Sequence, residues 1–82
     1  AADLREKLAP LSKQEKRLEA QIEKIQASLN KIESSLADEG MYLDENKNKL
    51  NKLIQEQGAL KSKLVSIEEE WLEIQEEIAN YS

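Results

Sequence analysis

The side chains of this chain that could do chemistry are amines, carboxylates and three aromatic rings, because its 82 residues include no Cys and no His. That composition excludes disulfides, thiolate and imidazole metal ligands, and the usual pairs of nucleophile and base. The sequence also lacks the glycine-rich loop that cradles a nucleotide phosphate. We therefore predict a binding role, with no catalytic residue, metal site or cofactor in these residues.

Lysines near the middle of the sequence are the best candidates for binding a partner. Nucleic-acid binding needs a clustered positive surface, because released counterions drive the affinity. The residues that we expect to be exposed and to touch a partner are Lys24, Lys31, Lys47, Lys49, Lys52, Met41 and Tyr42. Acidic neighbours dilute this patch, so an ordinary solvated helix surface is the alternative interpretation.

Charge is distributed unevenly along the chain, whose net charge is −5. Residues 1–37 carry seven basic and six acidic side chains, and residues 38–63 carry five of each. Residues 64–82 carry six acidic side chains and no basic one. These acidic residues are Glu68, Glu69, Glu70, Glu73, Glu76 and Glu77. One end of the folded chain is therefore expected to be acidic.

Apolar residues recur at alternating steps of four and three, which is the heptad pattern of a coiled coil. The first track consists of Leu4, Leu8, Leu11, Leu18, Ile22, Ile25, Leu29, Ile32 and Leu36. The second track consists of Leu43, Leu50, Leu53, Leu60, Leu64, Ile67, Trp71, Ile74, Ile78 and Tyr81. Glu15, Asn46 and Gln57 are the polar members, which we expect to fix the alignment or to lie at the solvated edge.

The two tracks meet at a short break, which predicts an all-α fold: an antiparallel two-helix coiled-coil hairpin in a single domain of residues 1–82. Gly40 can adopt the left-handed conformation that ends a helix, and Asp44 and Glu45 suit the first turn of the next one. Pro10 predicts a break near the start of the first helix. We expect a short helix over about residues 2–8, helices over about 11–37 and 43–81, and a turn over about 38–42.

Pairing the tracks across the seam suggests a register in which Leu18 faces Leu64 and Trp71 faces Leu11. This register also brings opposite charges together on the flanks, in the pairs Glu19 with Lys61, Glu33 with Lys47 and Lys7 with Glu77. Trp71 would fill the space beside the proline break, or would dock the base of the hairpin onto a neighbouring domain. The hairpin should be roughly 50 to 55 Å long.

Three short segments, in this order along the chain, carry a family resemblance. Residues 8–11 read Leu-Ala-Pro-Leu, residues 36–42 read Leu-Ala-Asp-Glu-Gly-Met-Tyr, and residues 71–78 begin with Trp and end with Glu-Glu-Ile. They resemble the helix-proline-helix start, the hairpin tip and the tryptophan-bearing end of the C-terminal arm of the ABC-F family. That family comprises soluble ATP-binding-cassette ATPases that act on ribosomes. The chain is most similar to the arms of the Uup-like and YheS-like bacterial members.

The resemblance implies that the chain comes from the C-terminus of a larger cytoplasmic ATPase, which binds ATP and Mg²⁺ in two upstream domains. The arm would project from the second ATPase domain, which lies at the base of the hairpin, and would touch the ribosome or other nucleic acid. No apolar stretch approaches the roughly 20 residues needed to cross a membrane, so no membrane partner is expected.

Two other functions fit the same residues. The chain could be a structural spacer or a dimerisation segment, in which case its apolar stripe pairs with another chain; we expect a monomer instead. It could also be a tRNA-binding helical arm like that of seryl-tRNA synthetases. Such an arm would be followed along the chain by a synthetase domain.

Overall fold

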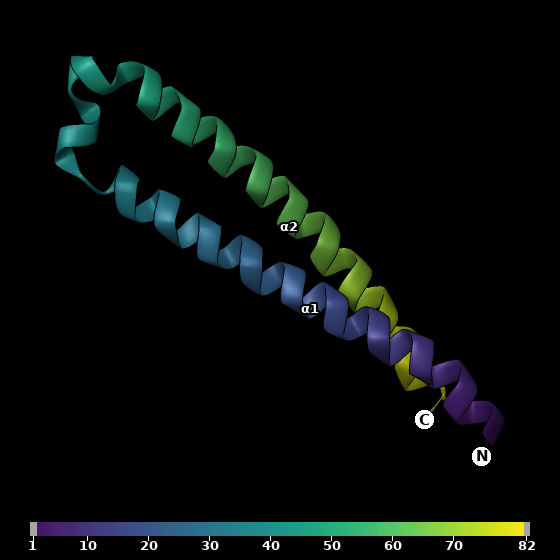
Figure 1. The fold of residues 1–82 in the computed structure, drawn as a ribbon. Coiled ribbons are helices and arrows are strands. Elements are labelled where there is room, and N and C mark those ends of the chain that lie inside the picture. Colours follow the sequence, from purple (N-terminus) through teal and green to yellow (C-terminus); the bar gives the residue numbers. More distant parts are fainter. Residues whose placement is uncertain (1, 82) are drawn as a thin grey trace.

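Two long helices joined by a short loop make up the computed structural model, which describes residues 2–81. Helix α1 spans Ala2–Leu36 and helix α2 spans Lys47–Tyr81, with 35 residues each. The loop contains two 3₁₀ turns, η1 (Glu39–Tyr42) and η2 (Asp44–Asn46). Figure 1 shows the resulting hairpin, with the loop at one end and both termini at the other.

The two helices run antiparallel. The Trp71 indole Nε1–H donates to Glu19 Oε1 at 3.3 Å, and the Gln75 amide Nε2–H donates to Glu15 Oε2. One turn forward along α2 therefore corresponds to one turn back along α1. The predicted all-α helical hairpin is confirmed.

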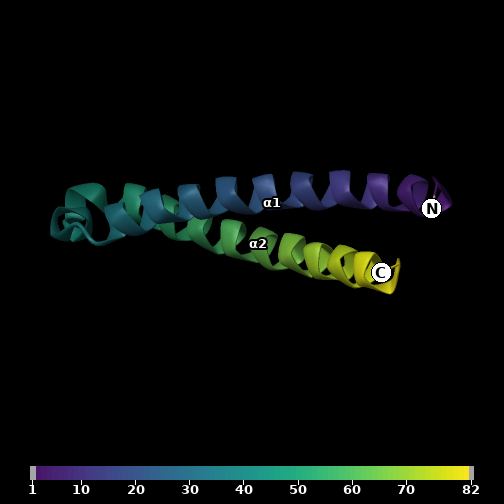
Figure 2. The same cartoon turned by 90° about the horizontal axis from the view of Figure 1, so that it is seen from below.

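Pro10 does not interrupt the first helix, so the predicted separate helices over about residues 2–8 and 11–37 are wrong. Helix α1 includes Pro10 and continues through it. Figure 2 shows α1 as one unbroken helix. Proline removes one backbone hydrogen bond and costs roughly 3 kcal/mol inside a helix. Here Leu8 and Leu11 flank the proline, both are half-buried on the seam, and Leu11 packs against the core. This packing on both sides of Pro10 offsets the cost and keeps the helix continuous.

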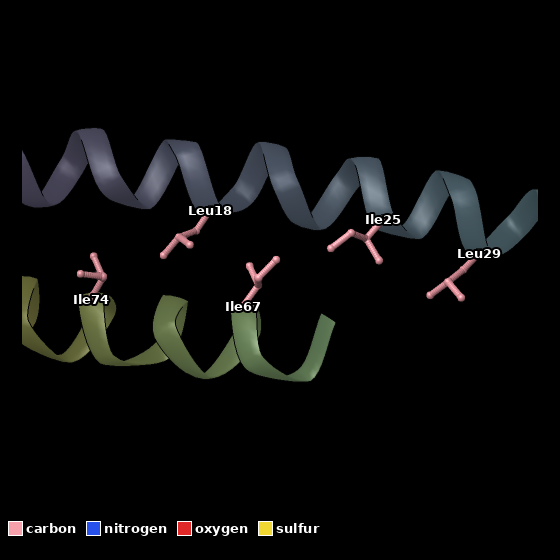
Figure 3. Close-up of a cluster of buried hydrophobic side chains, with 5 residues drawn as sticks. All are labelled: Leu18, Ile25, Leu29, Ile67 and Ile74. Atoms are coloured by element: carbon pink, nitrogen blue, oxygen red, sulfur yellow. The ribbon is translucent and has the colours of Figure 1, made fainter. Parts of the chain in front are cut away.

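The core is a single line of side chains between the helices. Its most buried member is Leu18, which is 4% exposed, and the central cluster consists of Leu18, Ile25, Leu29, Ile67 and Ile74 (Figure 3). All five belong to the predicted heptad tracks. Leu11, Ile22, Leu60, Leu64, Trp71 and Ile78 pack around them and remain partly exposed. The seam is therefore narrow, as expected for a coiled coil.

The register of the seam differs from the predicted one by about one heptad. Figure 3 shows Leu18 between Ile67 and Ile74, which is the level of Trp71 and not of Leu64. Trp71 accordingly bonds Glu19 and does not lie opposite Leu11. The predicted charge pairs of Glu19 with Lys61, Glu33 with Lys47 and Lys7 with Glu77 depended on the other register and lose their basis. Sliding a heptad repeat by seven residues restores apolar contacts, so the seam alone cannot choose between the two registers.

Both ends of the rod reflect this displacement. The first turns of α1 extend past the end of α2 (Figures 1 and 2), and Leu4 there is 40% exposed. Tyr81, the last heptad residue, is also 40% exposed. The molecule measures 64 × 15 × 14 Å and is longer than the 50 to 55 Å expected from the sequence. The overhang and the extended loop account for the difference.

Leu18 is expected to contribute most to stability per side chain. We predict that Leu18→Ala lowers the free energy of unfolding by about 2 to 5 kcal/mol, because a buried leucine leaves a cavity when it is truncated. Leu72→Ala is the matched control, since Leu72 is 54% exposed, and it should change stability by less than about 0.5 kcal/mol. Urea unfolding followed by circular dichroism measures both. Equal losses for the two variants would contradict the packing described here.

The register can be measured with spin labels, since the chain has no cysteine of its own. One pair of labels is attached through Glu19→Cys and Glu68→Cys, and a second pair through Glu19→Cys and Lys61→Cys. One heptad corresponds to about 10 Å along a helix. We expect the 19/68 pair to show the stronger dipolar broadening in electron paramagnetic resonance. Stronger broadening for the 19/61 pair would restore the register predicted from the charges.

Candidate functional site

The tip of the hairpin begins where α1 ends at Leu36. The Asp38 side chain accepts a hydrogen bond from the Gly40 backbone N–H at 3.0 Å and so caps the turn η1. Gly40 does not have a positive φ, so the expected left-handed glycine is wrong. A short acidic cap, and not glycine flexibility, therefore organises the reversal of the chain.

Two further side chains hold the loop. The Tyr42 hydroxyl donates to the Leu36 carbonyl at 2.7 Å, which satisfies one of the carbonyl groups that the end of α1 leaves unpaired. The Asn46 side-chain Nδ2–H donates to the Gly40 carbonyl at 2.8 Å and ties η2 to η1. Asn46, a polar member of the second heptad track, thus acts as a clamp within the loop.

The loop is also longer than predicted, because α2 begins at Lys47 and not near residue 43. Asp44 and Glu45 consequently lie in η2, before the first turn of α2. Met41 is buried, with 9% of its surface exposed, so the expectation that it is an exposed residue is wrong. Leu43, which was assigned to the seam, is 54% exposed instead. Tyr42 is 60% exposed and remains available at the tip.

The five candidate lysines are all exposed, but they do not form one face. They are Lys24, Lys31, Lys47, Lys49 and Lys52. Lys24 and Lys31 share the outer face of α1, whereas Lys47 and Lys49 occupy opposite flanks of the α2 seam in the heptad assignment. Lys31 also lines a surface groove together with Glu56. The positive charge of the outer half of the rod, the half nearer the tip, is therefore distributed around the rod.

An open groove of about 490 Å³ nearer the base was not predicted from the sequence. Its apolar lining comes from Ile22, Trp71 and Leu72, and its acidic lining from Glu19, Glu23 and Glu68, with Gln26 completing it. The sequence did indicate that the end of α2 is acidic and that Trp71 fills a space on the seam or docks onto a neighbouring domain. It could not bring Glu19 and Glu23 to that place, because the predicted register put Glu19 beside Lys61.

The acidic residues offer no metal centre. Among residues 2–81, no group of three or more Asp and Glu side chains is arranged to hold a metal ion. None of the side-chain N and O atoms buried in this part of the chain lacks a hydrogen-bond partner.

Comparisons with known proteins agree with this architecture. The ABC transporter C-terminal domain family matches residues 7–76, which cover most of both helices and the whole loop. Neither the curated proteins nor the solved structures contain a match to the chain. Across residues 2–81, both helices are too polar to cross a membrane. Because the family match covers most of the sequence, the chain belongs to the ABC transporter C-terminal domain family.

Proposed function

We propose that this chain is the accessory interaction arm of a soluble, cytoplasmic ABC-F ATPase that acts on the ribosome during translation. The observation that carries the proposal is a rod of 64 × 15 × 14 Å in a chain of the ABC transporter C-terminal domain family. A C-terminal domain of this family is distinct from the cassette that binds ATP, which agrees with a non-catalytic part. The resemblance of the segments around Pro10, Gly40 and Trp71 to ABC-F arms supports the finer assignment.

The shape of the hairpin suggests how such an arm would be used. Both termini lie at one end and the loop at the other, about one full rod length away (Figure 1). An ATPase domain of the same polypeptide would be attached at the base and would hold ATP and Mg²⁺. The tip would then reach a partner distant from the nucleotide. The antiparallel packing stiffens the arm, so a movement at its base would be transmitted to the tip.

The outer half of the arm is the part best suited to an anionic partner. It carries the five exposed lysines described above, whereas residues 64–82 carry only acidic charge. Contacts between lysine and phosphate provide affinity without sequence preference, so lysines distributed around a rod can still contribute. Tyr42 at the tip adds an exposed aromatic ring, which can stack on an unpaired base. Met41 is excluded because it is buried.

Charge reversal tests this proposal. The change replaces five lysines with glutamate, at Lys24, Lys31, Lys47, Lys49 and Lys52. Binding of the chain to purified ribosomes, measured by co-sedimentation at several salt concentrations, should weaken on the order of tenfold or more and lose much of its salt dependence.

The matched control reverses five exposed basic residues in the half of α1 nearer the base, which gives the same change in net charge. These residues are Arg5, Lys7, Lys13, Lys16 and Arg17. Circular dichroism verifies that both variants remain helical. Unchanged binding of the first variant, or an equal loss in the control, would remove the proposed contact surface.

The proposal also requires a monomeric arm. Residues of the same chain cover the central part of the heptad seam, so a second copy is not needed to bury it. Sedimentation equilibrium should therefore give a mass near 9.4 kDa. A mass twice as large at micromolar concentration would favour the dimerisation segment over the interaction arm.

A further inference from the structure

The groove beside Trp71 has an apolar floor that the fold does not cover. Leu72 is 54% exposed, and Trp71 is only half-buried. Together with Ile22 they line one side of an open groove of about 490 Å³, which is large enough for one or two side chains of a partner. Leu72 lies outside the heptad seam, so packing between the helices does not explain a leucine here.

The rim of the same groove is acidic. Glu19 and Glu23 lie one turn apart on α1, and Glu68 faces them from α2. No Lys or Arg is among the residues that line the groove. Like charges one helical turn apart repel each other. Residues 64–82 contain no basic side chain that could neutralise the α2 side. The register is what brings these charges together, because Trp71 bonds Glu19 across the seam.

The indole of Trp71 links the apolar floor to the acidic rim. Its Nε1–H donates to Glu19 Oε1 at 3.3 Å, so the carboxylate of Glu19 is held next to the aromatic ring. A carboxylate beside an indole matches one chemical group in particular, the arginine guanidinium. This group forms paired hydrogen bonds with carboxylates and also stacks on aromatic rings.

We propose that this groove is a docking site for an arginine-bearing segment of a partner protein. A guanidinium group of that segment lies between the carboxylates of Glu19, Glu23 and Glu68 and against Trp71. An aliphatic side chain beside it covers Leu72. The positive charge of arginine offsets the repulsion among the three carboxylates of the rim. The aliphatic side chain removes the exposed apolar surface of Leu72 from water. None of the residues that line this site belongs to the ribosomal contact proposed above, although Lys24 of that contact is adjacent to Glu23 on α1.

Trp71 is the chain's only tryptophan, so its fluorescence reports on the groove directly. The probe is a synthetic peptide, acetyl-Arg-Leu-Arg-Leu-Arg-amide, titrated into the whole chain. We expect a saturable change in emission, with a Kd confirmed by calorimetry. The peptide in which glutamate replaces arginine should cause no change. Absence of a saturable response to the arginine peptide would overturn the proposal.

Two sets of substitutions with identical net charge separate the groove from general attraction to an acidic surface. The first variant neutralises the rim through Glu19→Gln, Glu23→Gln and Glu68→Gln. It should raise the Kd about tenfold, because charge pairs in contact contribute most of such affinity. The second variant carries Glu69→Gln, Glu73→Gln and Glu76→Gln, which do not line the groove. It should change the Kd less than about twofold.

Leu72→Ala tests the apolar half of the site without disturbing the seam, and it should also weaken peptide binding. Equal weakening by the two glutamine variants would show diffuse attraction only and would contradict the assignment. Concentrating the chain alone provides the remaining test. If Trp71 emission shifts together with an increase in mass, a second copy occupies the groove and the proposal fails.

Discussion

The narrow apolar seam between α1 and α2 is the constraint on which the rest of the structure depends. A chain with 35% charged residues has little apolar area to bury, and one stripe on each helix is enough only if the two stripes meet along their whole length. That requirement keeps α1 straight through Pro10, since Leu8 and Leu11 lie on the stripe on either side of it. It also buries the side chain of Met41, which belongs to the loop turn η1.

The register, in contrast, is set at the tip. A heptad seam can slide by one repeat and still match apolar residues, so weaker features decide between the alternatives. The loop supplies them through the Asp38 cap, the Tyr42 bond to the end of α1 and the Asn46 clamp. Starting α2 at Lys47 lengthens the connection and moves α2 toward the tip. This shift of α2 aligns Trp71 with Glu19 nearer the base of the hairpin, where the acidic groove is formed.

Much of the fold could be predicted from the residue pattern alone. The heptad spacing identified both helices, their antiparallel pairing and nearly every core residue, because burial of a periodic stripe dominates the energy of such a chain. The register was predicted wrongly because it relied on pairs such as Glu19 with Lys61. Exposed ion pairs contribute only about 0 to 1 kcal/mol and cannot outweigh the loop. The break at Pro10 was predicted from the free-energy cost of proline inside a helix. Packing of Leu8 and Leu11 on the seam offsets that cost.

The candidate site was harder to foresee for the same reason. Exposure of the five lysines followed from composition and helical spacing, whereas their distribution around the rod followed from the heptad positions. The groove joins residues from two helices, and its members can be named only when the register is known. Trp71 stood out in the sequence, but its partner Glu19 did not.

Methyl NOE spectroscopy on a mixture of labelled and unlabelled chains tests the intramolecular seam most directly. We expect strong contacts from the Leu18 methyl groups to those of Ile67 and Ile74 within one chain. Contacts that appear only between differently labelled chains would contradict this expectation, as would contacts of Leu18 to neither isoleucine.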